Sequence, residues 1–343
     1  MHHIAIDLGS RKSQICIRDA TAAIVQEESL PTLELKDWLK KQQNGRLIIE
    51  TCAESFAVAM EAKAMGHEVR VVPATLVKQL GVGERRLKND QKDARKLSEV
   101  STRIDLPSVH IPSEQSQRIR ETCNMRESLV EARTKLVNGI RSYGRMKLCE
   151  IDSGSAESTP KRIRKAFGDA LPAAVERVLA AIEALNEQIA QADKEIRKMA
   201  KENESCARLM TAPGVGPVTA LRFFAVVDEV GRFATAHQLE SYLGLVPSEN
   251  STGERQQRHG AITKAGAKKV RWALVQAAWS AKGHCKGDPM VRWSERVAQR
   301  RGKKIAAIAL ARKMAGVLFA MLRDSKDYDP AILVSKKWEH VRA

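Results

Sequence analysis

The first hundred residues alternate short apolar runs with polar turns and amphipathic segments. Three β-rich runs follow one another closely and predict an antiparallel meander, over residues 2–9, 13–19 and 22–28. Helices and strands then alternate, with a helix over 33–42, a strand over 46–51, a helix over 56–65 and a strand over 68–73. Three strands followed by β/α units is the order of ribonuclease-H-like folds, so topology predicts an α/β domain of that class.

From about Glu114 the apolar spacing becomes that of long helices. Residues 117–147 predict one helix that is rich in cations, namely Arg118, Arg120, Arg126, Arg133, Lys135, Arg141, Arg145 and Lys147. Such a face is either solvated or follows a phosphate backbone, and we expect Arg126, Arg133 and Arg141 to contact nucleic acid. Residues 151–160 include Ser, Gly and Pro, a content that breaks the helix and predicts a linker.

A heptad pattern follows the linker. Apolar residues recur in alternating steps of three and four at Val175, Val178, Ile182, Leu185, Ile189, Ala192, Ile196 and Met199. A seam of this length predicts a coiled coil, because another helix must cover it. We favour pairing with a partner chain, and the alternative is packing against helices of the same chain.

The C-terminal region, from about residue 206, is predicted to be mostly helical and ends in basic helices over 268–280 and 302–322. Residues 213–217 have the sequence Pro-Gly-Val-Gly-Pro and lie between two apolar helical runs. In a helix-hairpin-helix element, Gly214 and Gly216 would let backbone N–H groups approach a DNA phosphate. A plain tight turn explains the same residues equally well.

Charge points to a polyanionic partner. The 343 residues include 58 basic and 41 acidic side chains, which gives a formal net charge of +17, whereas a hydrophobic content of 43% is that of an ordinary folded protein. Lys and Arg gain affinity for nucleic acid by releasing condensed counterions, so we expect DNA or RNA binding; a solvated basic surface is the alternative.

The remaining composition indicates the compartment. The six cysteines include no CxxC pair, which argues against a zinc site or a disulfide framework and fits a reducing cytoplasm. The sequence shows no leader pattern and no run of eighteen apolar residues, so we expect neither secretion nor membrane insertion.

Four carboxylates form a candidate metal site. Asp7 and Glu50 each end an apolar strand, and in a ribonuclease-H-like sheet these strands are neighbours. Asp90 and Asp93 are three residues apart, so on a helix they share a face. Four such oxygen donors suit Mg²⁺ or Mn²⁺, and two ions could clamp the attacking and leaving oxygens of a phosphodiester. Nearby cations that could hold the DNA strand are Arg85, Arg86, Lys88 and Lys92.

The first of these acids has a rival interpretation. A strand followed by Asp-x-Gly-Ser also occurs in actin-like ATPases, where the turn holds a nucleotide phosphate. That fold needs a second phosphate loop after a later strand. The only later Asp-x-Gly, residues 152–154, follows a basic helix, so the ATPase interpretation is disfavoured.

Residues 247–266 combine hydroxyl side chains, glycines and cations. Ser251 and Thr252 precede Gly253, and the nearby basic residues are Arg255, Arg258, His259, Lys264, Lys268, Lys269 and Arg271. Such a segment draws in a phosphate, and its hydroxyls act either as ligands or, if a neighbour activates one, as a nucleophile. The residues alone leave both roles open.

Several of these motifs together resemble one known family. IAIDLG, LIIE and NDQKDA in the N-terminal half, with APGVGPVTA and GLVPSENSTG…GAITKAG in the C-terminal half, are similar to the DEDD transposases of insertion sequence family 110, also called bridge-RNA-guided recombinases. The resemblance extends over about residues 4–322.

The resemblance implies a RuvC-like domain whose four acids are Asp7, Glu50, Asp90 and Asp93. It also implies a coiled coil and a small transposase domain with a serine nucleophile that forms a phosphoserine link to DNA. Two protomers would build a composite site, strands would be exchanged through a junction intermediate, and a structured RNA from the element would pair with target and donor DNA. Family members generally have Ser immediately before the loop glycine, where this chain has Thr252. We therefore favour Ser251 as the nucleophile over Thr252, with Ser248 a weaker candidate.

The expected architecture is thus α/β plus α. It comprises a catalytic domain over 1–110, a basic helix and coiled coil for oligomerisation over 111–205, a transposase domain over 206–325 and a tail over 326–343. The alternatives are a metal-dependent structure-specific DNA nuclease and a non-catalytic nucleic-acid-binding protein.

Overall fold

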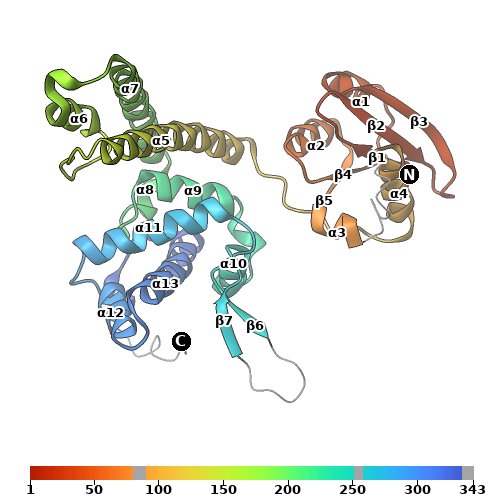
Figure 1. Cartoon of the computed structure of the whole chain (residues 1–343). Helices are drawn as coiled ribbons and strands as arrows, with labels where there is room; N and C mark the ends of the chain where they lie inside the picture. The colour runs from red at the N-terminus through yellow and green to blue at the C-terminus, as the bar shows by residue number, and fades with distance from the viewer. Residues whose placement is uncertain (80–89, 251–257, 334–343) are drawn as a thin grey trace. The chain divides into compact units, whose positions relative to one another are not determined.

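The computed structural model describes residues 1–79, 90–250 and 258–333, and the chain forms two compact units, Met1–Pro112 and Ser113–Ala343 (Figure 1). Each unit has its own buried core. The finer division at residues 205 and 325 stays a prediction.

A five-stranded mixed sheet organises the first unit. Its strands are β1 (His3–Asp7), β2 (Lys12–Arg18), β3 (Ile24–Pro31), β4 (Arg46–Glu50) and β5 (Glu68–Val72), in the order β3-β2-β1-β4-β5. The first three strands pair antiparallel, whereas β4 pairs parallel with both β1 and β5. The predicted meander is therefore confirmed, and so is the expected neighbourhood of β1 and β4. The strand order agrees with a ribonuclease-H-like fold.

Helices cover both faces of this sheet. On one face, α1 (Leu35–Leu39) and α2 (Ser55–Ala64) pack on alternate apolar residues of the strands, such as Ile4, Ile6 and Ile49. On the other face, α3 (Ala74–Gln79) and α4 (Asp90–Arg103) pack on the residues between them, including Ala5 and Ile48. Period-two alternation sends these two sets of side chains to opposite faces.

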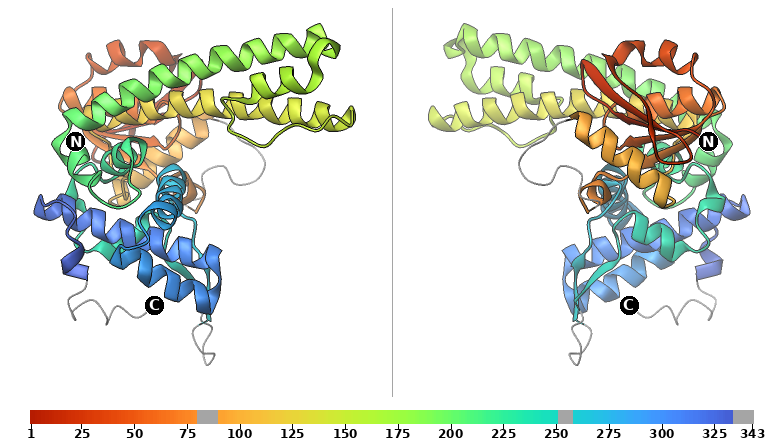
Figure 2. Two further views of the ribbon diagram at one scale, coloured as in Figure 1. Left: turned by 90° about the vertical axis from the view of Figure 1, so that its left-hand side faces the viewer. Right: turned by 90° about the vertical axis from the view of Figure 1, so that its right-hand side faces the viewer.

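Two long antiparallel helices begin the second unit and lie side by side (Figure 2). Helix α5 (Glu114–Met146) packs along α7 (Ala173–Glu202), with Val137 and Ile140 against Leu179 near one end and ion pair Arg126–Asp193 near the other. The buried heptad residues of α7 are Val175, Ile182, Ile189 and Ile196, and the other heptad residues are half-buried. Helices of the same chain therefore cover much of the seam, and pairing with a partner chain remains a proposal.

The predicted linker over 151–160 is only partly right. Helix α6 (Thr159–Phe167) begins inside it, and Pro160 stands in the first turn of that helix. Proline is favoured there because its fixed φ suits the helix and the N–H it lacks would have no intrahelical partner. Proline was therefore a start signal for a helix here and not a breaker.

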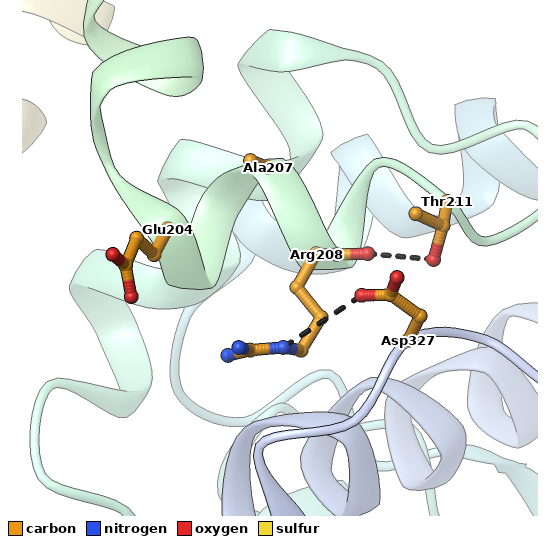
Figure 3. Close-up of a pocket in the computed structure, with 5 residues that line it drawn as sticks. All are labelled: Glu204, Ala207, Arg208, Thr211 and Asp327. Carbon is orange, nitrogen blue, oxygen red and sulfur yellow. Dashed lines mark hydrogen bonds and ion pairs between the residues drawn. The ribbon is translucent and has the colours of Figure 1, made fainter.

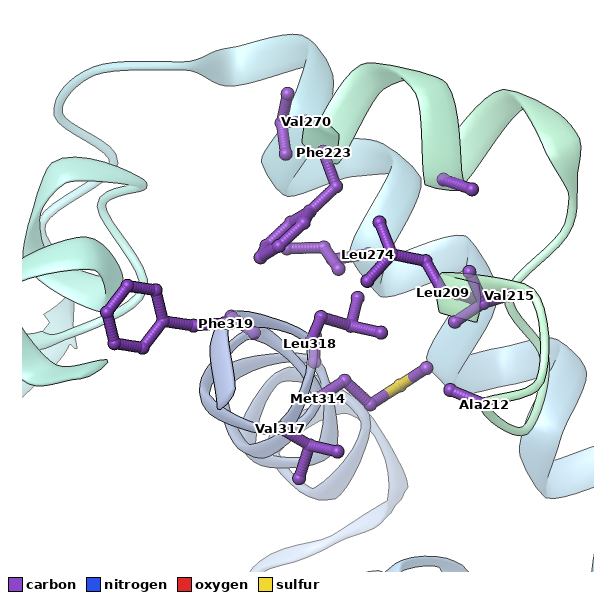
Figure 4. Packing of buried hydrophobic residues seen from close by; sticks show 14 of the residues in the cluster. Leu209, Ala212, Val215, Phe223, Val270, Leu274, Met314, Val317, Leu318 and Phe319 are labelled. Atoms are coloured by element: carbon purple, nitrogen blue, oxygen red, sulfur yellow. The ribbon is translucent and has the colours of Figure 1, made fainter. Parts of the chain in front are cut away.

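The C-terminal helices form a single core with the ends of α5 and α7. These elements are α8 (Glu204–Leu209), α9 (Pro217–Val227), α10 (Ala236–Tyr242), α11 (Lys268–His284), α12 (Pro289–Arg301) and α13 (Lys303–Asp324), with short 3-10 turns at Val230–Arg232 and Pro330–Leu333. Phe223, Leu274 and Leu318 are fully buried between α9, α11 and α13 (Figure 4). Among the described helices, α13 alone is long and apolar enough to cross a membrane, but 61% of its apolar window is buried inside this unit.

Candidate functional site

The first two candidate acids end neighbouring parallel strands in the same register. Ile6 of β1 pairs with Ile49 of β4, so the next residues, Asp7 and Glu50, stand side by side at the carboxyl ends of the strands. Because side chains alternate, both belong to the face on which Ala5 and Ile48 pack. This is the face covered by α4. Neither acid lies on the opposite face, against α1 and α2.

The register of α4 brings a third acid to the same end of the sheet. Ser101 is 2.8 Å from His3 Nδ1, and Ser98 Oγ donates to Cys16 Sγ at 3.2 Å, where Cys16 is the cross-strand partner of Ala5. The helix therefore runs opposite to β1. Asp93 lies five residues before Ser98, a rise of about 7.5 Å, and Asp7 lies two residues beyond Ala5, about 7 Å. Asp93 thus stands level with Asp7 and Glu50.

Burial of Asp93 adds to this picture. The inner face of α4 consists of Asp93, Ala94, Leu97, Ser98 and Ser101, and Asp93 is only 8% exposed. A carboxylate on a face that packs against a sheet requires a compensating partner. Its position at the end of the sheet, level with Asp7 and Glu50, suits a group that binds a cation.

The donor chemistry fits Mg²⁺ or Mn²⁺, because these ions prefer carboxylate oxygens. However, in the described part of the chain, no three His, Cys, Asp or Glu residues lie close enough together to hold an ion. The backbone of Asp90 begins α4, and its side chain lies outside the described residues. The described acids by themselves therefore do not make a complete metal site.

The cations predicted around these acids are mostly outside the described residues. Arg85, Arg86 and Lys88 fall there, whereas Lys92 is exposed on α4. Arg95, which the sequence analysis gave no role, forms a two-pronged ion pair with Glu27 of β3. This ion pair fastens α4 to the sheet, and it lowers the pKa of Glu27 through the hydrogen bonds from Arg95.

The hydroxyl-rich segment is framed by a β-hairpin that the sequence did not predict. Strands β6 (Pro247–Asn250) and β7 (Arg258–Ile262) pair antiparallel and extend from α10 (Figure 1). Ser251, Thr252 and Arg255, together with the side chains of Arg258 and His259, lie outside the described residues. Ser248 packs over Gly260 of the partner strand, where its Oγ would be 2.5 Å from an added Cβ.

The root of the hairpin is locked by close backbone contacts. Gly244 and Gly266 both have positive φ, and a Cβ at either would meet a carbonyl oxygen at 2.2 Å or less. Arg271 donates to the carbonyls of Leu243 and Ala265, at 2.8 and 3.0 Å. Arg271 therefore has a positioning role at the hairpin root, whereas Lys264 beside it is exposed.

The turn between α8 and α9 uses its two glycines differently. Gly214 has φ +73°, and a Cβ there would lie 2.3 Å from the Ala277 carbonyl of α11. A Cβ on Gly216 would meet nothing within 4 Å. Packing against α11 thus explains Gly214 without DNA, whereas Gly216 faces open space and stays a candidate for phosphate contact.

The cations of α5 divide into structural and exposed groups. Arg133 is 8% exposed and bonds to Glu157 at 2.7 Å and Asn186 at 3.0 Å, and Arg126 pairs with Asp193. These two hold α5 to the elements beside it. Arg141 is exposed and keeps its predicted role as a nucleic-acid contact.

A charge network joins α5, α9 and α11. Glu127 accepts from buried Arg222 at 3.0 Å and from Lys269 at 2.8 Å, while Lys268 is exposed at the start of α11. Burial alone would raise the pKa of the Glu127 carboxyl, but Lys269 and Arg222 hold that pKa below its usual value. Lys269 therefore has a structural partner as well as an exposed position.

Two other features, the cysteines and a pocket beside α8, have structural roles. All six cysteines are free, as expected, and burial raises the pKa of Cys206 to about 12. A shallow pocket beside α8 is lined by Arg208, Thr211 and Asp327, and Arg208 Nε is 3.7 Å from Asp327 (Figure 3). Because Tyr328 N donates to Thr211 at 2.9 Å, this pocket marks where the segment after α13 docks on α8.

Comparison with known proteins gives two family matches in separate parts of the chain. Residues 4–143 match a DEDD transposase family of IS110 elements, described as "Transposase", and residues 206–293 match the "Transposase IS116/IS110/IS902 family". The first match includes all four candidate acids, and the second includes the hairpin and α11.

Similar proteins span nearly the whole chain. A probable family 20 transposase of Pseudomonas aeruginosa is 28% identical over 96% of this chain and 99% of its own length. The transposase for insertion sequence element IS1111A of Coxiella burnetii is 27% identical over 95% and 90%. A pilin gene-inverting protein of Moraxella lacunata is 28% identical over 38% of this chain and 40% of its own length.

Proposed function

This chain belongs to the IS116/IS110/IS902 family of transposases, and from that premise we propose that it cuts and rejoins DNA during insertion and excision of a mobile element. The family match identifies the chain as a DNA transposase, and a DEDD transposase domain suggests dependence on a divalent metal. The proposed reaction takes place in the cytoplasm.

Asp7, Glu50, Asp90 and Asp93 are the proposed ligands of Mg²⁺ or Mn²⁺. Such ions stabilise the charge that develops on phosphodiester oxygens. The observation that best supports this assignment is the shared register of β1, β4 and α4, which brings Asp7, Glu50 and Asp93 level on one face of the sheet. Lys92, Arg85, Arg86 and Lys88 would hold the DNA backbone beside the acids.

Ser251 is the proposed nucleophile, with Thr252 as the alternative. Its hydroxyl would lose its proton as the oxygen bonds to phosphorus, the bond to the departing deoxyribose oxygen would break, and that oxygen would take up a proton. The gene-inverting name of one relative supports rejoining as well as cutting. We further propose that a structured RNA guides the reaction and that two or more copies of the chain build each site, in part through α7.

Trapping the covalent link tests the nucleophile. Full-length protein would be incubated with a labelled element end in Mn²⁺, denatured and resolved on a gel that retains protein–DNA adducts. Ser251→Ala is expected to remove the adduct, Thr252→Ala to leave part of it, and Ser248→Ala to leave it intact. An undiminished adduct in the Ser251/Thr252 double alanine variant would reject the proposal.

Asp7→Asn tests the acids separately. This substitution replaces one carboxylate oxygen with an amide nitrogen, which removes the negative charge and keeps the shape of the side chain. We expect cleavage to fall by at least about a hundred-fold, in line with the loss of several kcal/mol of charge stabilisation. Binding of DNA should remain, because the cations are unchanged.

A metal-dependent nuclease is the second candidate, because Asp7, Glu50 and Asp93 all lie in one compact unit, Met1–Pro112. In that case water would replace serine, and products would have free 5′-phosphate ends without attached protein. A non-catalytic binding protein would show no nicking above background and would tolerate Asp7→Asn. The adduct assay separates all three.

A further inference from the structure

Helix α11 exposes its two largest side chains, both tryptophans, and buries smaller aliphatic ones. Its buried face is aliphatic and rich in alanine, namely Val270, Ala273, Leu274, Ala277, Ala278 and Ala281. Trp272 and Trp279 are on the other side, 55% and 40% exposed. A tryptophan offers one of the largest gains from burial of any residue, so the packing of this chain does not account for two that stay in solvent.

The two rings share one face of the helix. They are seven residues apart, which is two turns, so they project in nearly the same direction about 10 Å apart along the axis. That separation is roughly three nucleotide steps of a stacked strand. Lys268 lies one turn before Trp272 and Gln276 lies between the rings, and both are exposed. In the described part of the chain, neither ring has an aromatic or cation–π partner.

The charge around the two tryptophan rings indicates which kind of partner they bind. Helix α11 has no acidic residue, and its cations are Lys268, Lys269, Arg271 and Lys282. Lys268 has no ion pair among the described residues, while Lys269 stays 50% exposed although it pairs with Glu127. An aromatic face beside uncompensated positive charge is complementary to a nucleic acid strand whose bases are unstacked.

The same helix fixes the hairpin. Arg271, the neighbour of Trp272, bonds to the carbonyls of Leu243 and Ala265 at the hairpin root. The aromatic face therefore begins beside the root of β6 and β7. DNA opened for strand cutting would present unpaired bases in this region.

We propose that Trp272 and Trp279, with Lys268, form a stacking surface for the unpaired bases of a single DNA strand. Flat rings stack on any base, and the lysine contacts the phosphate backbone, so the surface binds without sequence preference. The choice of DNA over RNA rests on the proposed function, whereas the stacking surface does not.

Binding without cleavage tests this surface. Full-length protein would be titrated into fluorescent oligothymidylate in the presence of a metal chelator, with anisotropy as the readout. Replacing either tryptophan with alanine should weaken binding about ten-fold. Leucine at both positions should weaken it as alanine does, because leucine is apolar but not flat, whereas phenylalanine should stay within about three-fold of wild type. Circular dichroism and thermal unfolding would confirm that each variant is folded.

Affinity for a continuous duplex should change less than two-fold in every variant, because stacked bases offer no free face. Equal binding of single strands by the leucine variant and the wild type would overturn the proposal. So would a loss confined to oligouridylate, which identifies an RNA surface, or a change of sedimenting mass in the leucine variant, which identifies a contact between copies. Adduct formation by Ser251 is scored separately, so the stacking surface and the proposed function can fail independently.

Discussion

Replacing Gly214 with alanine is expected to destabilise the second unit strongly. An alanine at φ +73° costs about 1–2 kcal/mol in backbone strain. Its Cβ would also lie 2.3 Å from the Ala277 carbonyl and 2.7 Å from Ala281 N, both backbone atoms of α11 that cannot rotate away. Forcing the turn away from α11 adds about 1–3 kcal/mol, as overpacking does elsewhere. We expect a loss of about 3 kcal/mol.

Thermal unfolding measures this loss directly. A change of about 3 kcal/mol lowers Tm by roughly 6 to 12 °C in a unit of this size. Gly216→Ala is the matched control, because a Cβ there meets nothing within 4 Å and its φ of −94° suits alanine. Its Tm should lie within about 2 °C of wild type, since surface substitutions change stability by about 0.5 kcal/mol.

DNA affinity then separates the two roles of the turn. If the N–H groups at this turn contact a phosphate, the methyl group of Gly216→Ala obstructs that contact and weakens DNA binding in a stable protein. If Gly214→Ala kept the wild-type Tm, the packing explanation of Gly214 would be refuted. Unchanged DNA binding by Gly216→Ala would refute the helix-hairpin-helix interpretation and leave a tight turn.

Three further predictions concern buried charge and capping. Arg133→Ala should lower stability by about 1–2 kcal/mol because it removes two part-buried hydrogen bonds, whereas exposed Arg141→Ala should weaken DNA binding at unchanged Tm; the opposite pattern would reverse the two assignments. Asp228→Ala should lower the free energy of unfolding in urea by about 2 kcal/mol, since Asp228 accepts hydrogen bonds from Ser113 N, Ser113 Oγ and Ser116 Oγ at 2.5–2.8 Å. Asp228→Asn, the control, should lower it less, and an equal loss in both variants would contradict the assignment. The depressed pKa of Glu127 means that its stabilisation is present above the unfolded value of about 4.5 and is lost as pH falls through the folded value. Glu127→Gln should therefore lower stability at pH 7 and converge with wild type once the pH falls below the folded value, and a constant difference would contradict this.

The sheet was predictable because its signal is local. The central strands β1 and β4 are short apolar runs, and the strand ends at Asp7 and Glu50 are marked by a change from apolar to acidic residues. That these strands are neighbours depends on pairing between residues far apart in the sequence, and only the analogy of topology predicted it. The position of Asp93 on the inner face of α4 follows from Leu97 and Ser98 packing on the sheet, which no spacing rule within the helix reveals.

The hairpin escaped prediction because its strands lack an apolar alternation. The segments PSEN and RHGAI contain one large apolar residue, Ile262, and the two strands pair with each other. Pairing of this kind depends on register and on the glycines at the root, Gly244 and Gly266. The heptad pattern of α7 has the converse limit: it predicts that a stripe is covered but not which helix covers it, and α5 of the same chain covers much of it.

Net charge is a poor guide to which cations bind nucleic acid. Arg120, Arg126, Arg133, Arg222 and Arg271 bond to carboxylates or carbonyls of their own unit, so part of the excess of +17 maintains the fold. Aromatic residues are only 4% of the chain, yet two of the five tryptophans stand exposed on one helix. Burial would stabilise these tryptophans more than exposure does. Their exposed position is therefore stronger evidence for a binding face than the presence of lysines beside them. A search for nucleic-acid contacts in this chain should therefore start from large apolar side chains that stay in solvent, such as Trp272 and Trp279.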